Sequence, residues 1–225
     1  MKNKIFALLL MATATLVMLT GCVIGGAGGL NTVRGRGELV SHEIAASGFT
    51  GINIGGAYEL TFRQSPEFSV TLDIQENLFE YIETSVRNNV FHITGRSGIG
   101  INTGSNTPRL IVYAPDLQYL NIRGAVSADI NVETEDLEIN VSGAGSLNFS
   151  GNVDSLHINS SGVASISAFD LVAANANIRL SGVGSIEVYA TDTLDVTLSG
   201  VGSVTYDGNP LVTSNRTGLG SISSR

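Results

Sequence analysis

From about Tyr119 onward, apolar and polar residues alternate in short runs that are separated by a phrase rich in glycine and serine. An alternation with period two is typical of β-strands, because successive side chains point to opposite faces. The first glycines of the phrases are spaced by 19, 19, 20, 18 and 18 residues. Six copies at this period predict a β-solenoid, in which each repeat forms one coil that stacks on the next. The six phrases are RGAVSADI, SGAGSLNF, SGVASISA, SGVGSIEV, SGVGSVTY and TGLGSISS.

Each phrase combines a predicted corner with a predicted ladder. Glycine lacks a Cβ atom, so the chain can bend there between two apolar runs. Stacking turns one position of the repeat into a column of side chains, and serine occupies the position after the corner in every copy. The hydroxyl groups of such a column can bond along the stack. An earlier segment, GAYELTF, fits the pattern as a first coil with Glu59 in this column. The predicted serine ladder consists of Ser127, Ser146, Ser165, Ser185, Ser203 and Ser221.

The part before the repeats, from about Glu38 to Leu120, is strand-like but irregular. Residues 49–62 and 68–74 alternate like strands, and residues 109–115 predict a buried strand that Pro115 ends. Residues 76–82 predict a short helix capped by Asn77. Residues 85–95 predict a hairpin, because Asn88 and Asn89 tolerate the positive φ of a tight turn. The segment 95–108 is rich in glycine, serine and asparagine and predicts a loop.

The N-terminal 21 residues have the plan of a secretory signal: two lysines, an apolar run, and small residues before Cys22. The sequence Leu19-Thr20-Gly21-Cys22 resembles a bacterial lipobox, which predicts that Cys22 carries a lipid. At about 0.8 kcal/mol per buried CH₂ group, several acyl chains would anchor the protein stably. Cys22 is the sole cysteine, so a disulfide within the chain is excluded. We therefore expect a signal peptide over 1–21, a Gly-rich tether over 22–33, and a folded domain over 34–225.

Charge narrows the set of partners. Without the signal, the chain has 10 arginines and 20 carboxylates, a formal charge of −10. An acidic surface without lysine disfavours nucleic acid and anionic lipid headgroups, because both repel it. We therefore expect contact with the membrane through the lipid on Cys22, no nucleic acid, and a protein or glycan ligand. A homo-oligomer is a further expectation, formed if an open edge of the last coil pairs with another chain.

The glycine phrases do not have the residues of known binding loops. A phosphate-binding P-loop needs a lysine, and a dinucleotide fingerprint lies between a strand and a helix. Calcium-binding solenoid repeats carry an aspartate where this chain has serine. The sequence thus predicts no cofactor, no metal and no catalytic residue in these phrases, and favours corners and ladders.

A second class of function stays open. Carboxylates gather in ETEDLE, residues 133–138, and some β-helical enzymes cleave acidic polysaccharides with clustered carboxylates. Because this run precedes the strand that starts at Leu137, a solvated corner is favoured, with a weak cation site as the alternative. A glycan-active enzyme that uses Glu133, Glu135 and Asp136, or a carbohydrate-binding module, is the rival to a non-enzymatic protein.

The motif Gly51-Ile52-Asn53 carries a family resemblance. Together with the lipobox, the segment ENLFEYI, the SG(V/A)GS repeats and YDGNP near the end, it resembles the head GIN domain family of auto-transporter adhesins, from about Glu38 to Arg225. The resemblance implies a right-handed parallel β-helix, a hand that parallel crossovers also favour. It brings no catalytic residues.

The expected protein is therefore all-β, a β-solenoid with an irregular, partly antiparallel N-terminal part and repeats over about 119–225. We expect an exported, lipid-anchored envelope protein, at the outer membrane, that acts without catalysis as an adhesin, a binding domain or a scaffold.

Overall fold

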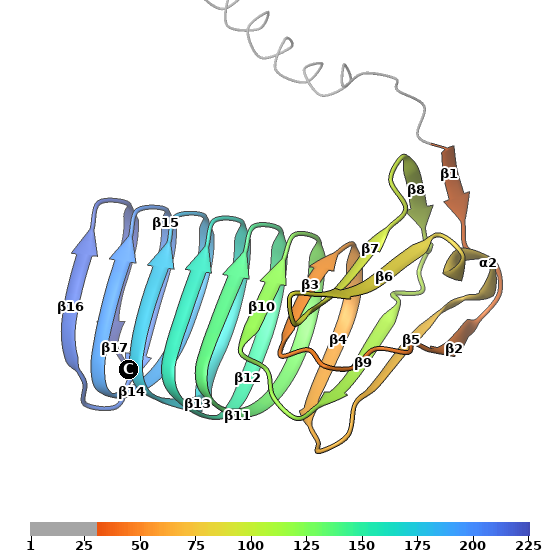
Figure 1. Cartoon of the computed structure of the whole chain (residues 1–225). Helices are drawn as coiled ribbons and strands as arrows, with labels where there is room; N and C mark the ends of the chain where they lie inside the picture. The colour runs from red at the N-terminus through yellow and green to blue at the C-terminus, as the bar shows by residue number, and fades with distance from the viewer. Residues whose placement is uncertain (1–30) are drawn as a thin grey trace, which may run out of the picture. The chain divides into compact units, whose positions relative to one another are not determined.

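The computed structural model describes residues 31–225, and residues 32–225 form one compact unit. Its larger part is a stack of parallel coils, seen in Figure 1 as the green to blue ribbons. The predicted β-solenoid is confirmed, with about six turns. Four long strands each make most of one coil: β11 (Ala125–Val141), β12 (Ala144–Ser160), β13 (Val163–Leu180) and β14 (Val183–Leu198).

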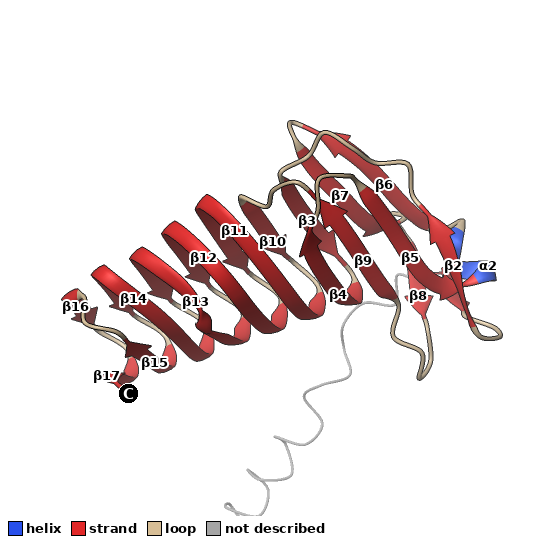
Figure 2. Ribbon diagram, turned by 90° about the horizontal axis from the view of Figure 1, so that it is seen from below, coloured by secondary structure: helices blue, strands red, loops and turns tan. Residues whose placement is uncertain are grey.

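Each long strand belongs to two sheets. It runs along one sheet, bends at a lower corner near residues 132–136 or their equivalents, and returns along the other sheet, as the curved ribbons of Figure 2 show. The glycines of the repeated phrases then form the upper corner, which leads to the next coil. The C-terminal coils are completed by β15 (Val201–Asp207), β16 (Leu211–Arg216) and β17 (Leu219–Ser224).

The N-terminal part extends both sheets. β10 (Tyr119–Ile122) pairs with β3 (Gly51–Gly55), which pairs with β7 (Val90–Gly95), all in parallel. In the other sheet, β11 pairs with β4 (Ala57–Gln64), which pairs with β9 (Arg109–Ala114). We name the sheet of β7, β3, β10, β16 and the second halves of β11–β14 the asparagine face. The serine face comprises β9, β4, β15, β17 and the first halves of β11–β14.

Antiparallel strands complete the N-terminal part, as predicted. β5 (Ser69–Gln75) pairs with β9 and with β2 (Leu39–Glu43). β6 (Ile82–Arg87) forms a hairpin with β7, and its turn has positive φ at Asn88 and Asn89 (51° and 61°). The hairpin prediction is therefore confirmed.

Three local predictions are wrong. The helix is shorter than residues 76–82, because α2 spans Glu76–Phe79 and the chain is extended again from Ile82. Asn77 does not cap it: its side chain bonds the backbone of Arg34 and Arg36 instead. The predicted loop 95–108 contains β8 (Ile99–Asn102), which pairs with β1 (Asn31–Arg34), so ordered structure begins inside the range expected for the tether.

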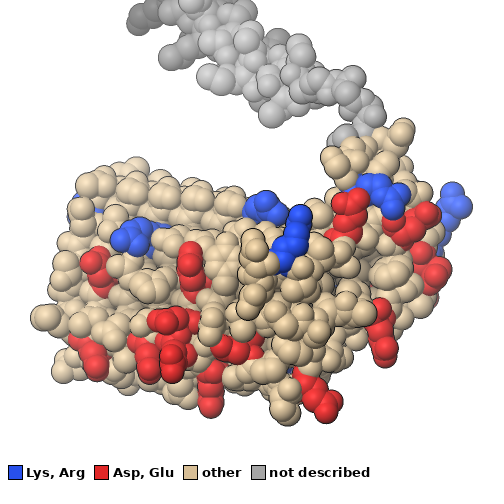
Figure 3. All heavy atoms as spheres, in the orientation of Figure 1, with Lys and Arg blue, Asp and Glu red and all other residues tan. Residues whose placement is uncertain are grey.

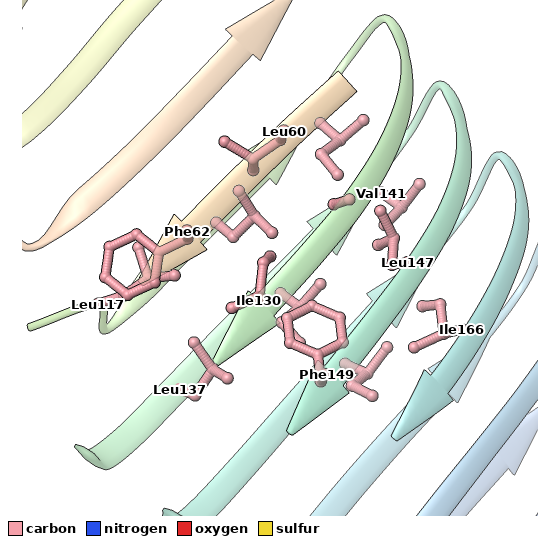
Figure 4. Packing of buried hydrophobic residues seen from close by; sticks show 14 of the residues in the cluster. Leu60, Phe62, Leu117, Ile130, Leu137, Val141, Leu147, Phe149 and Ile166 are labelled. Atoms are coloured by element: carbon pink, nitrogen blue, oxygen red, sulfur yellow. The ribbon is translucent and has the colours of Figure 1, made fainter. Parts of the chain in front are cut away.

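The hydrophobic core lies between the two faces and continues through the whole stack. Every other residue of each strand points inward, and the inner columns are almost entirely aliphatic or aromatic. Figure 4 shows such side chains from successive coils packed against one another, among them Leu60, Ile130, Leu147 and Ile166. Ser160 is an exception: it is 2% exposed in a column that otherwise holds aliphatic residues such as Val141 and Leu180.

Candidate functional site

One column of polar side chains runs along the outside of the asparagine face through the whole structure. Strand pairing places one residue of each strand opposite the next, so the column crosses both the N-terminal part and the coils, whose strands lie side by side in Figure 1. Asparagine is the commonest residue in it, and every asparagine except the last, Asn215, is half-buried. In spatial order, this asparagine ladder is His92, Asn53, Asn121, Asn140, Asn159, Arg179, Thr197 and Asn215.

Side-chain hydrogen bonds join neighbours of the ladder. Asn121 Nδ2 donates to Asn53 Oδ1 at 3.2 Å, and Asn53 Nδ2 donates in turn to His92 Nδ1 at 3.1 Å. In the coils, Asn159 Nδ2 donates to Asn140 Oδ1 at 3.1 Å. A carboxamide is both donor and acceptor, so stacked asparagines can bond along a sheet and still offer atoms to solvent.

The ladder gives the Gly51-Ile52-Asn53 motif a structural explanation. Ile52 points into the core and is fully buried, whereas Asn53 points outward as a member of the ladder. A Cβ atom on Gly51 would come within 3.0 Å of Val90 Cγ2 and 3.2 Å of Tyr119 Cβ, on the strands either side. In this motif Gly51 leaves room for the neighbouring side chains, Ile52 packs in the core, and Asn53 presents its amide on the outer surface.

A shallow hollow of about 410 Å³ lies over the middle of the asparagine face. The outward-pointing groups that line it are the carboxamides of Asn140 and Asn159 and the guanidinium of Arg179. Hydroxyl groups also line it, from the ladder residue Thr197 and from serines two positions after ladder residues in the sequence. Arg179 is exposed, and its NH1 donates to Asn177 Oδ1 at 2.7 Å, which orients the guanidinium. The hydroxyl residues of the hollow are Ser142, Ser161, Ser181, Thr197 and Ser199, together with the inward-pointing Ser160.

The predicted serine column lies on the opposite face. Pairing brings Ser127, Ser146, Ser165, Ser185, Ser203 and Ser221 into consecutive register, with Glu59 before Ser127. A hydrogen bond of 3.4 Å joins Ser165 Oγ and Ser185 Oγ. The neighbouring outward column is apolar and exposed, at Val163 (59%), Val183 (50%), Val201 (49%) and Leu219 (75%).

The carboxylates considered for catalysis lie at the lower corner. Glu133, Glu135 and Asp136 are all exposed, and Gln64 bonds the backbone of Glu133. Among residues 31–225, no three His, Cys, Asp or Glu side chains come together in a way that could hold a metal ion. The corner is thus a solvated edge, separate from the hollow.

The surroundings of His92, at the N-terminal end of the ladder, favour its neutral form. Partial burial lowers the pKa of His92, and the charges of Arg87 and Arg123 lower it further. The hydrogen bond from Asn53 also requires an unprotonated Nδ1. Arg87 and Arg123 therefore make this end of the face locally positive.

We predict that His92 titrates below pH 6.5, the usual pKa of histidine, in an NMR titration of its ring protons. Because the folded pKa is lower than the unfolded one, the unfolded chain binds more protons as the pH falls. The free energy of unfolding should therefore decrease as the pH drops below about 6.5 and level off below the folded pKa. Arg87→Gln, which removes one positive charge, should raise the pKa of His92. A midpoint at or above 6.5 in the unmodified protein would contradict this account.

The lipidation site Cys22 and the signal peptide 1–21 lie outside the described residues. No helix within 31–225 has the length and hydrophobicity to span a membrane.

Comparisons with known proteins agree on the fold. A "putative adhesin" of Bacteroides fragilis is 20% identical, with a TM-score of 0.62 over 86% of this chain and 100% of the other. A "putative lipid binding protein" of Parabacteroides distasonis is 24% identical, with a TM-score of 0.53 over 87% and 100%. A "putative adhesin" of Parabacteroides merdae is 20% identical, with a TM-score of 0.53 over 87% and 99%.

Among curated proteins, none matches the chain. Residues 48–210 match a protein family with the description "Putative auto-transporter adhesin, head GIN domain". This range begins just before Gly51-Ile52-Asn53 and ends at Pro210, so it includes the motif, most of the asparagine ladder and the hollow. The chain belongs to the head GIN domain family.

Proposed function

We propose that this protein is a lipid-anchored component of the bacterial cell envelope, at the outer membrane, that binds a partner through the asparagine face and catalyses no reaction. Membership of a family described as adhesins supports a place at the envelope or surface. Two of the structurally similar proteins bear the name of adhesins, and a third bears the name of a lipid binding protein.

The hollow on the asparagine face carries the proposal. It brings carboxamides, hydroxyls and one guanidinium to a surface that the rigid stack of coils holds in fixed register. Such groups recognise a ligand by hydrogen bonds. Because successive coils repeat the same outward positions, the surface suits a ligand that extends along the stack.

The anchor is tested with Cys22→Ala in the full-length chain. Without the sulfur no thioether to a lipid can form, so the variant should leave the membrane fraction and lose incorporation of labelled fatty acid. Val23→Ala, which keeps the sulfur, is the matched control and should fractionate like the unmodified protein. Unchanged membrane association of Cys22→Ala would show that something other than this lipid holds the protein.

Binding is tested with the mature protein, purified in detergent, on glycan and protein arrays. We expect a ligand whose signal falls when Asn140 and Asn159 are replaced by alanine and persists when Ser165 and Ser185, on the opposite face, are replaced. A ligand that depends only on the serine face would refute the assignment of the site.

The rival function is a glycan-active enzyme with its carboxylates at the lower corner. It predicts release of product from an envelope polysaccharide, abolished by Glu133→Ala, Glu135→Ala and Asp136→Ala together. The non-enzymatic proposal predicts no product with or without these changes, and array binding that survives them.

A further inference from the structure

Charge is distributed unevenly over the asparagine face. Figure 3 shows this side of the molecule, with carboxylates gathered toward the lower corner of the coils and arginines nearer the upper corner. The acidic members of the face itself, Glu138 and Asp195, lie one outward position below the ladder.

The upper half of the face contains no carboxylate of its own among the described residues, although Glu138 Oε1 accepts from Asn140 Nδ2 at 2.7 Å from the position below, and Glu83 on β6 lies opposite Thr94. It consists of the asparagine ladder and of the residues two positions after each of its members. These two columns contain Arg123, Arg179 and His92, in a chain with more carboxylates than basic residues. The second column is Thr94, Gly55, Arg123, Ser142, Ser161, Ser181, Ser199 and Thr217.

Neither arginine of these columns is neutralised by a carboxylate within residues 31–225. Ion pairs engage Arg63, Arg96, Arg109 and Arg225, all elsewhere. Arg179 bonds a neutral carboxamide, and Arg123 is exposed. Two guanidinium groups without a carboxylate partner, on an acidic protein, offer charge-assisted bonds to an anion.

The spacing of the two arginines along the stack suits an extended ligand. Arg123 follows β10 and Arg179 lies on β13, three strands further along the sheet. At about 4.8 Å per strand, their backbones are about 14 Å apart along the stack. The carboxamides and hydroxyls of the hollow lie between and around them. A polymer lying across the coils can contact both charges without either side chain bending toward the other.

We propose that the upper half of the asparagine face binds an acidic polysaccharide, whose anionic groups contact Arg123 and Arg179 and whose hydroxyls bond the side chains between them. This inference rests on the proposed binding function and adds the class of ligand. A sugar chain fits the hollow because the outward groups of the hollow are mainly hydroxyls and carboxamides, which bond sugar hydroxyls. The hollow has no exposed aliphatic column like that of the serine face. The net negative charge of the protein opposes the binding of any polyanion, so the affinity has to come from these two guanidinium groups and the hydrogen bonds between them.

The test compares polymers that differ only in charge. Mature protein in detergent is titrated with polygalacturonate and with its methyl-esterified form, and with dextran sulfate and dextran. We expect one or both anionic polymers to bind at least about tenfold more tightly than the neutral counterpart, with an affinity that falls as salt rises. The two anionic arms distinguish a carboxylate from a sulfate ligand. Equal binding of charged and neutral forms, or no binding of either anion, would overturn the proposal.

A matched pair of double variants locates the site. Arg123→Gln with Arg179→Gln should weaken binding of the anionic polymer by about tenfold or more, since each charge-assisted bond is lost. Arg34→Gln with Arg36→Gln removes the same charge from exposed residues at the β1 end and should change the affinity less than about twofold. Equal losses in both pairs would show a general charge effect and overturn the proposal.

Failure of this inference is distinguishable from failure of the proposed function. A neutral glycan or a protein that binds the arrays through Asn140 and Asn159, with no affinity for the anionic polymers, would refute the acidic ligand and keep the binding face. Binding of phosphatidylglycerol vesicles in place of the polymers would assign the arginines to a lipid surface and also refute the acidic polysaccharide.

Discussion

Gly162→Ala should lower the free energy of unfolding by about 3 kcal/mol or more, the upper end of what overpacking costs. A Cβ atom on Gly162 would overlap the carbonyl oxygen of Gly143 and come within 2.8 Å of the Ser142 carbonyl group. The obstacle is the backbone of the preceding coil, so a change of rotamer cannot relieve it. Moving the coils apart would break the hydrogen bond from Val163 N to Gly143 O, which is 2.9 Å long.

Urea unfolding of the mature protein, followed by circular dichroism, measures the effect. Ser161→Ala is the control, because its side chain is exposed and next to the same corner; it should change stability by less than about 0.5 kcal/mol. A Gly162→Ala protein with the stability of the control would show that the corner has room for a side chain.

Phe149→Ala should lower the free energy of unfolding by about 3–5 kcal/mol, because it removes a large buried ring from the middle of the stack. Phe149 is 3% exposed and lies opposite Ile130 in the preceding coil, as Figure 4 shows. On its other side the pairing of β12 with β13 is irregular, since the register shifts between Asn148 and Ser150. The ring therefore fills space where the next coil departs from the regular repeat.

The same unfolding experiment separates loss of volume from loss of hydrophobicity. Phe149→Leu keeps most of the volume and should cost less than about 1.5 kcal/mol. Val163→Ala, at a position that is 59% exposed, should have a much smaller effect than Phe149→Ala. If Phe149→Ala were no more destabilising than Val163→Ala, the core would not depend on close packing at this coil.

The repeats could be predicted from the sequence because their signal is local and recurs six times. Glycine spacing identifies the coils, and the alternation within each phrase identifies the inward side chains. The register of Glu59 with Ser127 also follows from the phrase itself. β8 could not be predicted, because a segment rich in glycine and asparagine becomes extended through its pairing with β1, which no local preference encodes.

The asparagine ladder escaped prediction for a different reason. Asn121, Asn140 and Asn159 recur at a spacing of 19 residues, so part of the signal is present in the repeats. Arg179 and Thr197 interrupt it, whereas the serines of the phrases recur without a break. Asn53 and His92 come from the irregular part, and only strand pairing places them in line with Asn121.

The irregular spacing of the repeats has a consequence for how the family can diversify. The coil between Gly162 and Gly182 is 20 residues long, yet the serines and glycines of its upper corner stay in register with the next coil. Its extra residues lie between Ala168 and Val172, beyond that corner. Insertions there leave the positions of the outward side chains near the glycines unchanged. Members of the family could therefore differ in the number of coils, or in the length of one coil, while successive coils stay about 4.8 Å apart. The length of the outward face, and with it the length of an extended ligand that it can contact, would then increase with the number of coils.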